Sequence, residues 1–399
     1  IILIYYLSIA QNNEFLIINN INIHNNKRTK KSYILRELTI KKGDTLSNPK
    51  QLTVAKENLL NTSLFNFIDI TIDTLSDNYA NINIYTTERW YLWPNPVLEL
   101  ADRNFSVWLK NKKISRTSFG TYIVQDNLFG AKENLKILLR VGYTNTFGIE
   151  YSMPYINKNK TIGIGLTSSL NLNKEIYYSI NQNKQLFYNN NKNIQQKYSN
   201  SLSIAYHPTF YKYLYLSLLY DKINLSDSVI ILFPYYAGIK KQNNLFKLSI
   251  LFKYDRRDSK NYPLKGYYFD TEYSNTKYND IQFNNINQNI KLFIPLTNNL
   301  FYGCAITNKL IDNNNLPFIL QQGLGYKKDY VRGFEYYVIN GEYFFLYKNA
   351  IAYNIINVKQ KKLNLFKNEK FDKIHYAAYI TTFFDMAYLK KNILPDKLS

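Results

Sequence analysis

Two kinds of hydrophobic pattern meet near Trp90. Between Glu14 and Trp90, stretches with strand spacing alternate with stretches in which apolar residues recur at helical spacing. Beyond Trp90, many segments of about ten residues alternate between apolar and polar positions with a period of two. Because successive side chains of a strand point to opposite faces, this second pattern predicts strands with one apolar face. The chain therefore divides into a small mixed module and a large region of strands.

The first module is predicted to be α+β. Leu52, Ala55 and Leu59 recur at helical spacing after Asn48-Pro49, a cap followed by proline at the first helical position. Thr29 is a second candidate helix cap. The predicted elements are a strand at Phe15–Ile23, a helix from Thr29 to Leu38, a helix after Pro49, and strands at Leu64–Leu75 and Ala80–Glu88.

Two architectures fit the later alternation. A soluble sandwich would use strands of about five or six residues with the apolar face in a core. A transmembrane barrel uses strands of about ten residues with apolar residues outward and aromatic girdles. Strand length and the 38 tyrosines favour the barrel. One of its clearest strands alternates Phe246, Leu248, Ile250 and Phe252 with Lys247, Ser249 and Lys253.

Composition narrows the chemistry. The 399 residues carry 50 Lys and Arg against 29 Asp and Glu, a formal charge of +21, but dense basic runs with a nucleic-acid motif are absent. We interpret the charge as drift of an AT-rich genome, with affinity for an anionic membrane surface as the alternative. One cysteine and three scattered histidines leave little for a metal site. No G-x-S-x-G element or phosphate-binding glycine loop occurs, so we expect no enzyme activity and no cofactor.

The N-terminal residues suggest export. Ile1 to Gln11 form an apolar stretch that ends in small residues, like a secretory signal peptide without its basic start. We expect residues 1–13 to be the remnant of such a peptide; the alternative is a buried N-terminal strand.

The sharpest motif is Val331-Arg332-Gly333-Phe334, within a long connection at 308–340. It resembles the VRGF motif of the outer-membrane assembly-factor superfamily, which includes BamA/TamA-type barrels and two-partner-secretion exporters. The resemblance implies one POTRA domain at 14–90, a junction at 91–114 and a mainly β, antiparallel transmembrane barrel at 115–399. The connection corresponds to the loop that this family folds into the barrel lumen. Two further elements resemble the family: the Arg257-Asp258 to Gly266 strand-turn-strand, and the closing Glu88-Arg89-Trp90-Tyr91 of the POTRA domain.

A partner for the loop arginine follows from charge. An arginine carried into a lumen needs an anion, because an unpaired, partly desolvated charge is costly. Asp385 lies on the lumen face of the strand Tyr376–Tyr388 if the alternation holds. The family pairs its loop arginine with an F-x-D-x-G motif, which Phe383, Asp385 and Ala387 match except for Ala in place of Gly. We predict an Arg332–Asp385 pair; the alternative is that each side chain is solvated in a wet lumen.

Strand number and tryptophans complete the expected barrel. We count about eleven strands before the loop and two after it, whereas the family closes with sixteen. We therefore expect about three C-terminal strands to be missing, because an unclosed barrel leaves unpaired backbone groups in lipid. Trp90, Trp93 and Trp108 cluster in the junction and are assigned to the membrane interface.

The resemblance implies a protein of the bacterial outer membrane with its POTRA domain in the periplasm. It would insert or assemble other β-barrel proteins, with unfolded clients captured at the edge of a POTRA strand, Leu64–Leu75 or Ala80–Glu88, and folded at the barrel seam. The lipid bilayer is a second partner, and periplasmic chaperones or lipoproteins are further ones. The alternatives are a dedicated exporter of the same superfamily and a passive, porin-like structural barrel.

Overall fold

The structure is a computed structural model that describes residues 15–48, 50–76, 78–100, 108, 116–157, 159–209, 211–259, 262–313, 315–321, 323–326, 328–362 and 373–390. Residues 1–13 and most of the predicted junction therefore lie outside the described residues. The chain forms two compact units. One comprises residues 1–97, 120–139 and 148–167, and the other comprises 98–119, 140–147 and 168–399.

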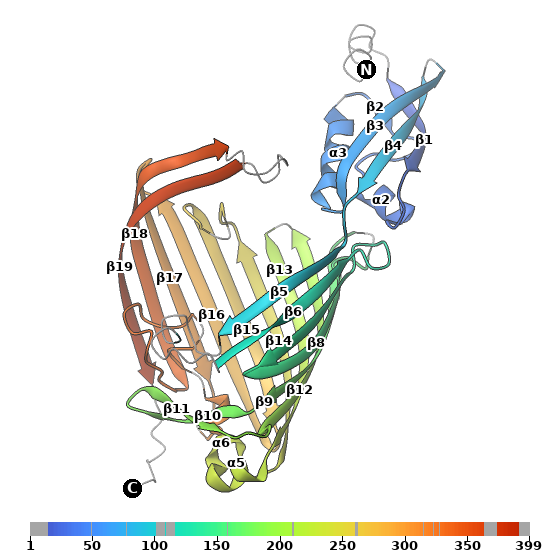
Figure 1. The fold of residues 1–399 in the computed structure, drawn as a ribbon. Coiled ribbons are helices and arrows are strands. Elements are labelled where there is room, and N and C mark those ends of the chain that lie inside the picture. The colour runs from blue at the N-terminus through green and yellow to red at the C-terminus, as the bar shows by residue number, and fades with distance from the viewer. Residues whose placement is uncertain are drawn as a thin grey trace. The chain divides into compact units, whose positions relative to one another are not determined.

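The first module is a four-stranded sheet with two helices, blue in Figure 1. Its strand order is β2-β1-β4-β3, in which β1 and β4 run parallel and β3 and β4 antiparallel. The helices bury one face of the sheet, and Ile34, Leu59 and Ile82 are among the fully buried side chains of this core. The elements are β1 (Leu16–His24), α2 (Lys31–Glu37), β2 (Thr45–Leu46), α3 (Lys50–Asn61), β3 (Phe65–Ser76) and β4 (Tyr79–Glu88).

One of the two predicted helix caps is wrong. Asn48 does cap α3, because its side-chain oxygen accepts the Lys50 amide at 2.9 Å. The N-cap of α2 is Lys30, and its side chain makes no capping bond. Thr29 serves another purpose: its buried hydroxyl accepts a 2.9 Å bond from Asn127 and lies 3.2 Å from the Tyr91 hydroxyl. Those partners are distant in sequence, which is why a local pattern missed them.

The second region is a 13-stranded sheet whose order follows the chain from β5 to β19, with only β10 and β11 left out. Among the described residues, eleven of these strands precede the loop and two follow it; the sequence predicted about eleven and two, but β5 was not among the predicted strands. The strands are β5 (Leu92–Leu100), β6 (Thr117–Asp126), β7 (Asn134–Gly142), β8 (Thr144–Met153), β9 (Ile162–Asn173), β12 (Gln195–Thr209), β13 (Lys212–Leu225), β14 (Gln242–Asp255), β15 (Gly266–Tyr278), β16 (Ile281–Pro295), β17 (Leu300–Ile311), β18 (Tyr343–Lys362) and β19 (Lys373–Lys390).

The predicted alternation is confirmed in β14. In β14 the side chains of Phe246, Leu248, Ile250 and Phe252 are all exposed, and the residues between them are more covered. An exposed apolar row of this kind is what a barrel presents to lipid. No helix among the described residues is both long enough and apolar enough to cross a membrane.

The sheet begins earlier than the sequence predicted. The predicted first strand, Thr117–Val124, corresponds to β6, and β5 precedes it inside the predicted junction. β5 contains Pro94 and Pro96, which have no N–H to donate to a neighbouring strand. Among the described residues β5 is an end strand of the sheet, where proline is tolerated.

The loops hold elements that the alternation did not reveal. β10 (Glu175–Asn181) and β11 (Lys184–Asn189) form a separate hairpin, and α5 (Asp227–Leu232) and α6 (Pro234–Ala237) lie between β13 and β14. Together with η2 (Phe318–Leu320) they pack into one apolar cluster, in which Val229 is fully buried. These elements are held by packing between loops, not by their own periodicity.

Candidate functional site in the loop between β17 and β18

The loop spans residues 312–342 in the structure, slightly displaced from the predicted 308–340, because β17 continues to Ile311. It lies beside the inner wall, where Lys309 of β17 and Phe344 of β18 share a polar cavity of about 410 Å³ with Asp329 of the loop. The Val331-Arg332-Gly333-Phe334 motif lies in the part of the loop that precedes β18.

Arg332 and Asp385 are brought together, as the sequence predicted. One Asp385 oxygen accepts Arg332 Nε at 2.8 Å and the Arg332 backbone N–H at 2.9 Å, and the other accepts Arg332 Nη2. Arg332 Nη2 also donates to the Asn349 carbonyl of β18 at 2.9 Å. The Asp385 side chain is 1% exposed and that of Arg332 is 29% exposed. Such a two-pronged, charge-assisted pair fixes both position and orientation of the loop.

The neighbouring motif residues support this pair. The Phe383 ring lies under the Arg332 guanidinium, whose Cζ is 4.0 Å from the ring centre. Gly333 has φ of +90°, a conformation that side chains rarely adopt, which explains glycine next to the arginine. Val331 packs with Ala387 of β19 against a small cluster that includes Leu346. The alanine that replaces the family glycine therefore takes part in the packing.

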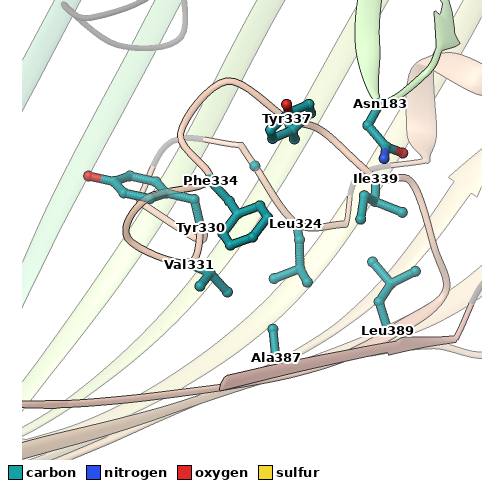
Figure 2. Close-up of a pocket in the computed structure, with 10 residues that line it drawn as sticks. Asn183, Leu324, Tyr330, Val331, Phe334, Tyr337, Ile339, Ala387 and Leu389 are labelled. Atoms are coloured by element: carbon teal, nitrogen blue, oxygen red, sulfur yellow. The ribbon is translucent and has the colours of Figure 1, made fainter. Parts of the chain in front are cut away.

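An apolar cavity of about 680 Å³ adjoins the pair. Figure 2 shows Val331 and Phe334 of the loop above Ala387 and Leu389 of β19, with Asn183 at the tip of the β10–β11 hairpin. The Phe334 side chain is 60% exposed and borders this cavity. The hairpin is also bonded to the loop, because the Val338 N–H donates to the Asn183 carbonyl at 2.8 Å.

Two loop contacts were missed by the sequence analysis. Lys348 stands directly opposite Asp385 in the β18–β19 register, and its Nζ donates to the Lys328 carbonyl at 3.1 Å. The Asn183–Val338 bond is the other. The inward alternation of β18 could have indicated Lys348. A main-chain bond between two distant loops leaves no trace in the residue pattern.

The predicted hairpin motif forms the turn between β14 and β15. Arg257 binds Asp255 through Nε and Nη2 at 2.8 and 2.9 Å, and this carboxylate raises the pKa of Arg257. The Asp258 side chain accepts the Leu264 N–H at 3.1 Å and so closes the turn. Gly266 has φ of +105°, and a Cβ there would stand 2.1 Å from the Arg256 carbonyl oxygen. These contacts hold the turn together.

The hairpin and the loop motif lie on one row of the sheet. The register pairs Asp255 with Tyr268, then Lys291, Ala305, Lys348 and finally Asp385. Five steps of about 4.8 Å separate the ends of this row by about 24 Å along the sheet. The two motifs are therefore separate clusters on the same inner face.

The tryptophans are only partly placed. Trp90 and Trp93 are exposed, and the Arg89 guanidinium lies 5.6 Å from the Trp93 ring. Trp108 is described without the residues on either side of it. The assignment of these three residues to the membrane interface stays a prediction.

Comparison with known proteins gives a consistent result. The family model described as the Omp85 superfamily domain matches residues 127–344, and the POTRA model, described as surface antigen variable number repeat, matches residues 16–89. A search among curated proteins finds no match.

Among solved structures, BamA from Haemophilus ducreyi lacking POTRA domains 1–3 is similar with a TM-score of 0.66 and 16% identity, over 94% of this chain and 72% of that chain. CdiB from Acinetobacter baumannii is similar with a TM-score of 0.53 and 12% identity, over 94% of this chain and 64% of that one. At these identities the likeness shows the fold.

Proposed function

The chain belongs to the Omp85 superfamily of outer-membrane β-barrel proteins, and we propose that it inserts or assembles other β-barrel proteins into the outer membrane. The observation that carries the proposal is the loop fixed to the inner wall by the Arg332–Asp385 pair. A passive pore does not require an arginine-bearing loop that is fixed to its wall. A barrel that inserts polypeptides needs the loop in its lumen to be held in a defined position.

Client capture is assigned to the free edge of the POTRA sheet, on the periplasmic side of the membrane. Both Leu64–Leu75 and Ala80–Glu88 were candidate edges in the sequence. The second is excluded, because β4 is paired on both sides, with β1 and with β3. β3 is the end strand of the sheet among the described residues, and its Phe67 and Leu75 side chains are exposed. Such an edge can accept an extended client as an added strand.

We expect a photo-reactive amino acid at Thr71 of β3 to cross-link an unfolded outer-membrane protein. The same amino acid at Asn83 of β4, its direct cross-strand partner, should give few adducts, because a client on the β3 edge is one strand further away. Adducts are measured by mass on the full chain in liposomes. Equal adducts at both positions would contradict capture at the β3 edge.

The second candidate is a dedicated exporter, favoured by the likeness of the fold to CdiB as well as to BamA. The two functions differ in the final location of the client protein. We would reconstitute the protein in liposomes, add an unfolded barrel client, and separate protease-protected product by alkaline extraction. Insertion leaves the client in the membrane pellet, and export leaves it in the vesicle interior. Ion conductance without protected client would support a pore.

A further inference from the structure

Positive charge gathers where the end of α2 meets two turns of the strand region. Arg36 lies in the last turn of α2, Lys132 in the turn between β6 and β7, and Lys160 in the turn between β8 and β9. All three segments belong to the same compact unit. The cluster is separate from the Arg332–Asp385 pair and has no part in the proposed insertion mechanism.

Two carboxylates stand beside these cations. Glu37 Oε2 accepts Lys160 Nζ at 2.7 Å, and its Oε1 lies 3.4 Å from Arg36 Nη2. Glu133, next to Lys132, accepts the amides of its own turn, Phe129 and Ala131, through one oxygen. Three cationic side chains therefore face two carboxylates, which leaves an excess of positive charge in a mostly covered place.

The excess of positive charge affects the pKa of Lys132. Burial lowers its pKa, and the like charges of Arg36 and Lys160 lower it further, while Glu37 alone acts in the opposite direction. The cluster as it stands disfavours the charged amine. An additional anion beside Lys132 would offset both the desolvation and the repulsion.

A buried donor without a partner lies in the same place. The Tyr33 side chain is 3% exposed, its oxygen faces the Arg36 guanidinium, and its O–H has no acceptor within the described residues. Burial, followed by the charge of Glu37, raises the pKa of Tyr33, so the hydroxyl remains a donor at neutral pH. The Arg36 guanidinium lies over its ring at 4.6 Å. A buried polar group of this kind normally has a partner.

The turns hold their lysines in fixed positions. Lys132 and Lys160 have φ of +68° and +55°, in the left-handed region that residues with a side chain rarely occupy. Asn127 accepts the Lys132 N–H at 3.0 Å, and Asn157 accepts the amides of Thr161 and Ile162 at 2.9 Å. Turns whose backbone is held in advance lose little freedom when an anion binds.

We propose that Arg36, Lys132, Lys160 and the Tyr33 hydroxyl form a binding site for a phosphate group. Guanidinium, ammonium and hydroxyl donors in one cluster suit the several oxygens of a phosphate. Two sources carry that group, a phospholipid headgroup and free phosphate. Phe129 and Ile156, on the same two turns, are 61% and 49% exposed and could contact the glycerol and acyl portion of a lipid.

The test measures binding to the full chain in a zwitterionic detergent by calorimetry. The probes are dihexanoyl phosphatidylglycerol, dihexanoyl phosphatidylcholine and inorganic phosphate. We expect Lys132→Gln/Lys160→Gln to weaken binding of the preferred probe at least tenfold. Lys41→Gln/Lys42→Gln removes the same charge from exposed positions of the same domain and should leave binding unchanged. Tyr33→Phe keeps the ring in the core and should weaken binding severalfold.

The outcomes distinguish a phospholipid headgroup from free phosphate, and they test whether the phosphate site exists. Phosphatidylglycerol bound tenfold more tightly than inorganic phosphate would identify a lipid headgroup site, and equal affinities would identify a free phosphate site. The proposal is overturned if no probe binds. It is also overturned if the double variant, shown to be folded by its circular dichroism, binds as tightly as the Lys41/Lys42 control.

Discussion

Asp385→Ala is expected to release the loop from the inner wall. Among the described residues, this leaves the Arg332 guanidinium beside Phe383 with the Asn349 carbonyl as its one bonded acceptor. Removing one member of a buried ion pair costs about 3–5 kcal/mol, and the partial exposure of Arg332 places this pair near the lower value. About 3 kcal/mol corresponds to roughly a hundredfold change in the equilibrium between held and released loop.

Trypsin measures that release, since Lys328 and Arg332 are cleavage sites within the loop and both remain in the variant. We expect cleavage there to accelerate strongly in Asp385→Ala. Asp280→Ala is the matched control: it removes a carboxylate that pairs with Lys240 at an exposed turn, and such pairs contribute little. Unchanged cleavage in Asp385→Ala would mean that other contacts hold the loop.

Leu59→Ala should destabilise the POTRA domain by about 2–5 kcal/mol, because it removes a fully buried side chain and leaves a cavity. A small domain has only about 5–15 kcal/mol of stability in total. The β3 edge depends on this core, so we expect client cross-links from Thr71 to fall together with the stability.

Hydrogen exchange followed by mass spectrometry on the full chain resolves this effect. Amides of α3 and β4 should exchange faster in Leu59→Ala, while those of β13 and β14 serve as an internal reference. Leu35→Ala makes the same change at an exposed position of α2 and should stay within about 0.5 kcal/mol of the parent. Equal exchange in the two variants would contradict the assigned core.

Much of the fold was predictable because the membrane barrel imposes a period of two residues on its strands and the POTRA core imposes helical spacing on its helices. Lipid on one side and a polar lumen on the other forced alternation onto β14 and its neighbours. The helix–sheet core forced helical spacing onto Leu52, Ala55 and Leu59. β5 was not predicted because it contains two prolines, which a strand tolerates only at an edge of the sheet. The sequence also did not predict β10, β11, α5 and α6, because packing between loops stabilises them and leaves no periodic pattern.

The site was predictable to the extent that charge must be balanced. Arg332 and Asp385 were paired from the cost of a buried charge, from the face on which Asp385 lies, and from the family motif that Phe383 and Asp385 resemble. Which POTRA edge is free could not be derived in the same way. Alternation identifies strands without giving their order, and only the position of β4 between β1 and β3 excluded it.

Client insertion by a set of charge-exchange variants tests the central claim most directly. The liposome assay would compare the parent protein with Arg332→Asp, Asp385→Arg and the double exchange, scoring client that is protease-protected and resists alkaline extraction. We predict that each single exchange abolishes insertion and that the double exchange restores part of it. Insertion at the parental level in both single variants would contradict a role for the fixed loop in assembly.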